Sequence, residues 1–90
     1  ANLCRSVAYE EANNNILINT ISPGPVRIDD SKFSPEYREF RKQYYDDQLK
    51  RIPLNRLAEA DDIFNLCNFL ISKTNSYITG EEFFITGGAL

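Results

Sequence analysis

The most informative stretch of this chain reads Ile16-Leu17-Ile18-Asn19-Thr20-Ile21-Ser22-Pro23-Gly24-Pro25-Val26. A nearly continuous aliphatic run leads into a Pro-Gly-Pro turn, and a helical pattern precedes the run. Such runs are typical of strands in parallel sheets, where both faces of the strand are covered. Residues 16–21 are therefore predicted to form a buried strand. The loop after it lies where open α/β sheets bind ligands.

Two helices are predicted around this strand. The first covers residues 1–14, and its apolar side chains recur at helical spacing: Leu3, Cys4, Val7, Ala8 and Ala12. The Asn triplet at 13–15 ends it, because Asn tolerates the left-handed backbone of a helix stop. The second helix begins at Ser34-Pro35-Glu36, which supplies a hydroxyl N-cap, a Pro at the first helical position and an acid in the first turn. It runs to about Arg51 and stops before Pro53.

A third helix and a second strand complete the predicted elements. The helix begins near Ala60, where Asp61 and Asp62 favour its positive end. Its apolar stripe consists of Ile63, Leu66, Cys67 and Leu70, widened by Phe64 and Ile71. Residues 77–80 form a turn, and residues 82–86 form a strand that Gly87 and Gly88 close. Strands joined through helices are parallel, with a right-handed crossover. The predicted fold class is therefore α/β.

The aliphatic run needs more cover than this chain provides. A two-stranded sheet cannot cover both faces of the run, and burying one Ile or Leu side chain contributes about 1.5–3 kcal/mol. Losing half of that for Ile16, Leu17, Ile18 and Ile21 costs several kcal/mol, against a total stability of roughly 5–15 kcal/mol. The chain also starts within a helical pattern and contains no Met. We therefore expect the tail end of a larger domain.

Composition excludes several classes of function. The 90 residues are 42% hydrophobic and 26% charged, which is typical of a globular protein, and the net charge of −3 gives no reason to expect nucleic acid or a membrane as partner. No apolar run is long enough to span a bilayer. Without His, and with only Cys4 and Cys67, the chain is not expected to hold a Cys/His metal site or a Ser-His-Asp triad. Two buried thiols in the cytoplasm are expected.

Four motifs in order carry a family resemblance: residues 14–26, Ile-Pro-Leu-Asn-Arg at 52–56, Tyr-Ile-Thr-Gly at 77–80, and the terminal glycine pair at 87–88. With the helices between them, they resemble the C-terminal part of a classical short-chain dehydrogenase/reductase. The resemblance implies that residues 1–90 are the last two strands and crossover helices of one NAD(P)-binding, Rossmann-like, doubly wound parallel sheet. The N-terminal half of that domain is then absent from the chain.

The resemblance implies an oxidoreductase that transfers a hydride between nicotinamide and a carbonyl or secondary alcohol. In that family a glycine-rich turn holds the NAD or NADP pyrophosphate, and a Tyr-x-x-x-Lys pair performs the acid–base chemistry. Neither motif is present: the sequence has no glycine-rich phosphate turn, and no Tyr stands four residues before a Lys. Both are expected upstream of Ala1. No catalytic residue is therefore predicted here, and the chain alone is expected to be inactive.

The resemblance also assigns cofactor-binding residues, which are Pro23, Gly24, Pro25, Val26 and Ile28. The Pro-Gly turn packs beside the nicotinamide in the family, and the backbone at Val26 binds the carboxamide. Pro-Gly-Pro as a stiff turn alone is the alternative. The family usually has Thr at position 28, and an Ile cannot donate that hydrogen bond. Either Asp29, Asp30 or Ser31 replaces it, or the cofactor is held more loosely.

Residues 28–54 correspond to the variable substrate lid of the family. An aromatic stripe lies on one predicted helical face: Phe33, Tyr37, Phe40 and Tyr44. These side chains either cover a small-molecule substrate or simply pack the helix onto the body. The charges of the segment are nearly balanced, which predicts a solvated face. An anionic substrate group at one of its arginines remains open.

The residues interpreted as structural are Asn19, Arg56, Gly80, Gly87 and Gly88. The resemblance implies a homotetramer, joined in part through the last strand, and a missing N-terminal half as a further partner. Two alternatives stay open. The chain is a truncated, non-catalytic module for binding or oligomer assembly, which would associate through its exposed apolar strand face, or it is a small α/β domain of unrelated function.

Overall fold

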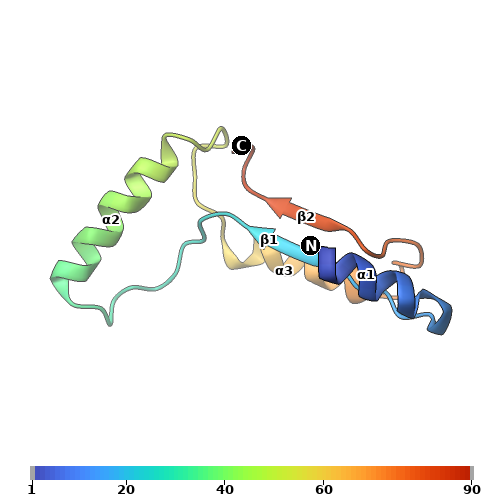
Figure 1. Cartoon of the computed structure of the whole chain (residues 1–90). Helices are drawn as coiled ribbons and strands as arrows, with labels where there is room; N and C mark the ends of the chain where they lie inside the picture. Colours follow the sequence, from blue (N-terminus) through green and yellow to red (C-terminus); the bar gives the residue numbers. More distant parts are fainter. Residues whose placement is uncertain (1, 90) are drawn as a thin grey trace.

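The computed structural model describes residues 2–89, which form an elongated molecule of 51 × 27 × 24 Å. The elements follow in the order α1 (Asn2–Glu11), the 3-10 helix η1 (Ala12–Asn14), β1 (Thr20–Pro23), α2 (Pro35–Leu49), α3 (Ala60–Ile71) and β2 (Glu82–Ile85). Figure 1 shows β1, β2, α1 and α3 gathered at one end of the molecule, while α2 stands apart at the other end. The predicted helices are confirmed, each to within a few residues.

Two of the predicted helix ends have the expected cause. Asn15 adopts the left-handed backbone at φ 60° and ends the first helical segment. At the start of α2, the Ser34 hydroxyl accepts a hydrogen bond from the Tyr37 N–H at 3.2 Å. Pro35 occupies the first helical turn, where its missing N–H costs nothing.

The start of α3 is fixed by charged side chains. The Asp62 carboxylate accepts the Glu59 N–H at 2.8 Å, and it accepts two bonds from the Arg56 guanidinium at 2.9 and 3.3 Å. The hydrogen bond from Arg56, followed by that from the Glu59 N–H, lowers the pKa of Asp62 below its ordinary value. The same contact raises the pKa of Arg56. Arg56 is therefore structural, as interpreted from the sequence.

The inner face of α3 packs on β1. The predicted stripe is confirmed, since its four members are half-buried: Ile63, Leu66, Cys67 and Leu70. The predicted widening is wrong, because Phe64 is 60% exposed and Ile71 is 83% exposed. Both lie roughly a quarter turn from the centre of the stripe, beyond the strip of the helix that one short strand covers.

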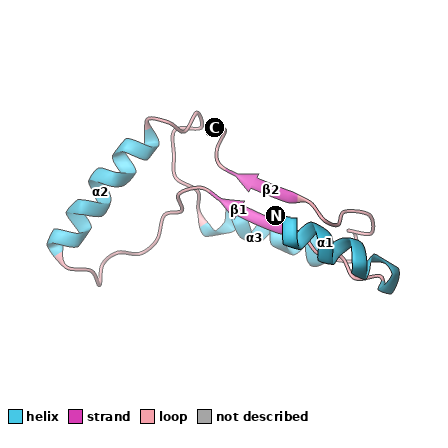
Figure 2. Ribbon diagram, in the orientation of Figure 1, coloured by secondary structure: helices cyan, strands magenta, loops and turns pink. Residues whose placement is uncertain are grey.

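The two strands pair in parallel, as predicted (Figure 2). The register joins Thr20 to Glu82, Ile21 to Phe83, Ser22 to Phe84 and Pro23 to Ile85. The predicted second strand is confirmed to within one residue. The first prediction, a strand over residues 16–21, is wrong, because the ladder begins at Thr20 and extends to Pro23.

The β1–β2 ladder begins only at Thr20, because residues 18 and 19 are bonded to the 78–81 turn largely through side chains. The Ile18 N–H donates to the Thr79 hydroxyl at 3.0 Å, and the Gly80 N–H donates to the Ile18 carbonyl at 2.7 Å. Asn19 uses both ends of its amide: it donates to the Ile78 carbonyl at 3.0 Å and accepts the Glu81 N–H at 3.1 Å. Gly80 has φ +74°, which interrupts extended pairing. The predicted backbone tie by Asn19 is confirmed.

A second amide secures the same turn. Asn75 is only 7% exposed and donates to the carbonyls of Leu70 and Ile78 at 3.1 and 3.2 Å. Its side-chain oxygen accepts the Ile78 N–H at 3.0 Å. Asn75 therefore connects the end of α3 to the turn that Asn19 holds. The sequence analysis did not predict this role, because an Asn in a polar loop carries no visible signal of burial.

As expected from the sequence, the two-stranded sheet does not cover both faces of the aliphatic run. Ile16 is 47% exposed, and Leu17, Ile18 and Ile21 are half-buried. Within residues 2–89 the two-stranded sheet is too narrow to cover them further. The predicted burial of Cys4 and Cys67 is wrong, since both free thiols are half-buried. None of the helices formed by the described residues is long and apolar enough to cross a membrane.

We predict that Asn19→Ala lowers the free energy of unfolding by about 1–3 kcal/mol, because a partly buried carbonyl and a backbone N–H lose their partner. Urea unfolding of the protein that carries these residues, followed by circular dichroism, measures the change. Asn65→Ala is the matched control, since Asn65 is exposed on α3. Equal effects of the two substitutions would contradict the role of Asn19.

We predict that Arg56→Gln raises the pKa of Asp62 toward the ordinary Asp value of about 3.9. Because the folded pKa is lowered, ionised Asp62 stabilises the fold above that ordinary value, and the stabilisation is lost as the pH falls through the folded pKa. A carboxyl ¹³C titration by NMR follows the group directly. Lys73→Gln, a charge change beyond α3, should leave the titration unaltered. An unchanged Asp62 in Arg56→Gln would disprove the assignment.

Candidate functional site

The carboxyl ends of β1 and β2 border a cavity of about 170 Å³. Parallel strands leave a sheet at the same edge, so the two segments that follow them meet there. The lining residues are Gly24, Pro25, Ile52, Leu54, Arg56, Ala58, Asp62, Ile85, Thr86 and Gly87. Two of the predicted cofactor-binding residues, Gly24 and Pro25, thus lie beside two other motifs of the resemblance, residues 52–56 and the glycine pair at 87–88.

The loop after β1 is held by backbone hydrogen bonds. The Gly24 N–H donates to the Ile85 carbonyl at 2.8 Å, which extends the strand pairing by one step. The Pro25 carbonyl accepts the Ala58 N–H at 3.0 Å, and the Arg27 N–H donates to the Ala58 carbonyl at 2.8 Å. Pro25 has no N–H of its own to satisfy. Val26 of this loop therefore forms an isolated parallel β-bridge with Ala58.

This bridge leaves the backbone of Val26 available. In a parallel bridge the flanking residues supply the bonds to the partner, and the central residue directs its own N–H and C=O to the other side. No hydrogen bond within residues 2–89 uses either group of Val26. One donor and one acceptor at adjacent positions of a held loop can bind a planar amide, which presents the complementary pair.

The far wall of the cavity comes from Ile52 and Leu54, at the end of the segment predicted to be the substrate lid, and from Gly87, for which no site role was predicted. Ile52 is 6% exposed, and the Leu54 N–H donates to the Gly87 carbonyl at 3.1 Å. Gly87 has φ +64°, and a Cβ there would stand 2.7 Å from the Ile52 Cγ2. Only glycine therefore allows residues 52–54 to approach the end of β2 this closely. The sequence signal was the motif at 52–56, whose place beside Gly87 depends on the tertiary fold.

The remaining predicted cofactor residues lie outside this cavity. Pro23 is exposed and ends β1. Ile28 is 51% exposed and lines a second cavity, between the loop after β1 and α2. Of the residues suggested to replace a Thr at 28, Asp29 accepts the Ser31 N–H at 3.0 Å. That backbone bond, with a side-chain bond to Ser31, lowers the pKa of Asp29. Asp30 lines the second cavity.

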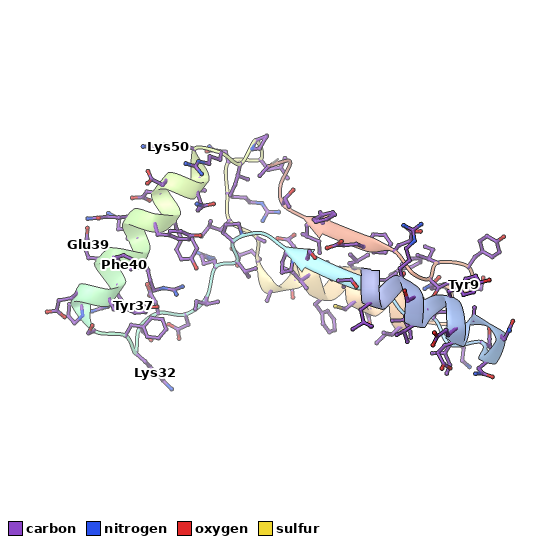
Figure 3. The ribbon with its side chains drawn as sticks, in the orientation of Figure 1. Tyr9, Lys32, Tyr37, Glu39, Phe40 and Lys50 are labelled. Carbon is purple, nitrogen blue, oxygen red and sulfur yellow. The ribbon has the colours of Figure 1, made fainter. Side chains whose placement is uncertain are left out.

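The aromatic stripe of α2 forms contacts within its own segment. The rings of Phe33 and Tyr37 meet edge to face at 5.1 Å, and those of Tyr37 and Phe40 stack at 6.3 Å. Tyr37, Phe40 and Tyr44 are 47%, 66% and 52% exposed. Figure 3 shows Tyr37 and Phe40 on α2, away from the sheet. Both interpretations of the stripe, as a substrate lid and as packing onto the body of the domain, stay predictions.

The described residues offer few groups for other chemistry. Within residues 2–89, no three His, Cys, Asp or Glu side chains are arranged to hold a metal ion. Arg56 and Asp62, the charged residues of the first cavity, are bound to each other. The first site therefore offers a ligand an apolar cavity at a sheet edge. Next in the chain to its lining residue Pro25 is Val26, whose backbone groups make no hydrogen bond within residues 2–89.

The whole chain is similar to known reductases and dehydrogenases. A family model described as Enoyl-(Acyl carrier protein) reductase matches residues 1–89. The 3-oxoacyl-[acyl-carrier-protein] reductase of Aquifex aeolicus is 37% identical over 84 residues, which is 93% of this chain and 32% of that protein.

Solved structures agree in fold. A short-chain type dehydrogenase/reductase from Mycobacterium marinum has a TM-score of 0.79 and 31% identity, covering 97% of this chain and 32% of its own. YwfH, an NADPH-dependent reductase involved in bacilysin biosynthesis, has a TM-score of 0.79 and 25% identity, covering 99% of this chain and 35% of its own. This chain thus spans about a third of the length of the proteins it matches. It belongs to the short-chain dehydrogenase/reductase family, with the α/β fold that its sequence predicts.

Proposed function

We propose that these residues form the nicotinamide-facing wall of an NAD(P)-dependent oxidoreductase that acts on a carbonyl or secondary alcohol. The observation that carries this proposal is the loop from Pro23 to Val26, at the carboxyl edge of a parallel sheet. The N–H and C=O of Val26 make no hydrogen bond with any other residue in the range 2–89. Membership of the family supports it, as does the NADPH dependence named for one structural relative.

Val26 is the residue that would hold the cofactor. Its N–H would donate to the carboxamide oxygen, and its C=O would accept from the carboxamide NH₂. When bound, the cofactor supplies or accepts the hydride, while the substrate oxygen gains or loses a proton. Pro23, Gly24 and Pro25 set the path of the loop and let the backbone approach the ring. Ile28 contributes an apolar contact in place of a hydroxyl.

The sequence indicates which parts of the reaction these residues would serve. Residues 1–90 contain no Tyr-x-x-x-Lys pair, so we infer that the proton-transferring groups come from elsewhere in the protein. The segment 28–54 acts as the substrate lid, with Phe33, Tyr37, Phe40 and Tyr44 as its apolar lining. On this proposal the isolated chain is inactive. Its free thiols support a reducing compartment, the cytoplasm.

Exposed apolar side chains favour a second role in assembly. Phe84 on β2 is 68% exposed, and Phe64 and Ile71 on α3 are 60% and 83% exposed. Apolar surface of this kind marks contact sites with other subunits or segments. If the protein is an oxidoreductase, the rest of the domain and the other subunits of a homotetramer would cover this surface. A non-catalytic assembly module would use the same surface but would not bind a dinucleotide, so cofactor binding separates the two roles.

We predict that Ile28→Thr tightens binding of the dinucleotide about two- to tenfold, because the restored hydroxyl adds one hydrogen bond worth about 0.5–1.5 kcal/mol. Calorimetry with NADH and NADPH, on the protein that carries these residues, measures the dissociation constants. Ile16→Thr makes the same chemical change at an exposed site remote from the loop and should leave both constants unchanged.

We further predict that Val26→Pro weakens binding by a similar factor, because the N–H that holds the carboxamide is removed. Circular dichroism checks that the variant keeps its fold. If neither dinucleotide binds the unaltered protein at millimolar concentration, the oxidoreductase proposal fails and the assembly role is favoured.

A further inference from the structure

A second cavity of about 170 Å³ lies between α2 and the loop after β1, and it shares no residue with the first cavity. Its apolar lining includes Ile28 and Leu57. Arg27, Arg41 and Lys42 bring positive charge to it, against a single carboxylate, Asp30. Tyr45 adds a hydroxyl. A concave site with an apolar surface and converging polar groups is the usual form of a small-molecule site.

Arg41 is the unusual residue of this cavity. Its guanidinium carbon lies 5.2 Å from the ring centroid of Phe33, 5.9 Å from that of Tyr37 and 5.1 Å from that of Tyr45. One of its terminal nitrogens donates to the Tyr45 hydroxyl at 3.4 Å, a long bond. Three aromatic rings therefore hold the cation in place, and they leave its hydrogen-bonding capacity largely unused.

The Arg41 Nε–H has no hydrogen-bond partner among the residues that the structure describes. The atom is shielded from solvent and makes no hydrogen bond within the described residues. A buried donor left unsatisfied costs about 1–3 kcal/mol, more when it is charged, so a ligand acceptor that displaces the atoms shielding it removes that cost. Guanidinium groups bind carboxylate and phosphate oxygens well, because their N–H groups match the spacing of those oxygens.

The surrounding charges favour an anion. Neither Arg41 nor Lys42 forms an ion pair with any residue in the described range 2–89. Arg27 does pair with Glu59 at 3.0 Å, but both side chains are largely exposed and the pair is weak. Asp30 opposes an anion and leaves the cavity with an excess of cations. The site thus resembles an anion-binding pocket in which the central cation is pre-positioned.

The position of the cavity connects it to the proposed chemistry. Ile28, which lines it, stands two residues after Val26, and Arg27 is tied through its N–H to Ala58. The opposite wall is α2, the proposed lid. A ligand here would therefore lie beneath the lid and next to the loop that we assign to the nicotinamide.

We propose that this cavity binds the anionic end, a carboxylate or a phosphate, of the carbonyl or alcohol substrate. Arg41 determines the specificity for charge, Lys42 assists it, and Ile28 and Leu57 contact the apolar part of the substrate. The choice of a substrate as the ligand rests on the proposed function. The affinity for an anion does not.

The first experiment measures anion binding without cofactor. The Arg41 Nε–H resonance of the labelled full-length protein is followed during titration with 4-oxopentanoate, with its methyl ester and with inorganic phosphate. We expect the two anions to shift this resonance with saturation, and the uncharged ester to leave it in place. Absence of a saturable shift with both anions, or an equal shift with the ester, would overturn the inference.

The second experiment measures selectivity in the presence of the better dinucleotide. We expect kcat/KM for 4-oxopentanoate to exceed that for the methyl ester by about tenfold to hundredfold, the worth of a hydrogen bond to a charged group. Arg41→Gln should abolish most of this preference, and Arg41→Lys, which keeps the charge but lacks the Nε–H, should be intermediate. Lys42→Gln, a change at an exposed residue, tests the site even if Arg41→Gln does not fold.

Controls separate the two proposals. Lys73→Gln removes a charge far from the cavity in sequence and should leave the preference unaltered. A loss of dinucleotide affinity in Arg41→Gln, with unchanged preference between acid and ester, would assign the anion to the cofactor and overturn the inference. Saturable anion binding in a protein that binds neither dinucleotide would support this site while rejecting the proposed oxidoreductase. Dinucleotide binding with an Arg41 that ignores anions would do the reverse.

Discussion

The hydrogen bonds between residues 18–20 and the turn at 78–81 are the constraint on which the rest of the structure depends. The Asn19 amide and the Thr79 hydroxyl take the places of backbone partners where Gly80 interrupts the extended chain. These bonds join segments about sixty positions apart in sequence and set the parallel register. Asn75 then fixes the end of α3 to the same turn. Two side-chain amides, each both donating and accepting, therefore hold this turn against the first strand and the end of α3.

The register determines where the site forms. With Pro23 opposite Ile85, both strands end together, and the segments after them meet in one cavity. Gly87 allows Ile52 to close its far side. The bridge from Val26 to Ala58 then holds the loop with one N–H and one C=O directed outward. The hydrogen bonds of Asn19 at one end of the sheet thus help to position the backbone of Val26 at the other end.

The two arginines of the candidate sites are used in opposite ways. Arg56 has its partners within the chain, the carboxylate of Asp62 and the Leu57 carbonyl, and it fixes the start of α3. Arg41 is surrounded by aromatic rings and keeps an unsatisfied donor. Arg56, with a carboxylate partner, stabilises the start of α3, whereas Arg41 is the residue for which we propose a ligand. The two arginines thus differ in their surroundings rather than in residue type.

The sequence by itself determined the family, the α/β class, the helix starts and the parallel pairing. The family was indicated by the resemblance of its four motifs, and the other features follow from local signals, such as the Ser34 cap, the Asn15 stop and the order of helices and strands. Only the tertiary structure decided that the ladder begins at Thr20, that Asn75 is buried, and that Ile52 and Leu54 line a cavity. Each of these features depends on partners that are distant in sequence. The periodicity of a segment does not show which distant residue will bond to it or pack against it.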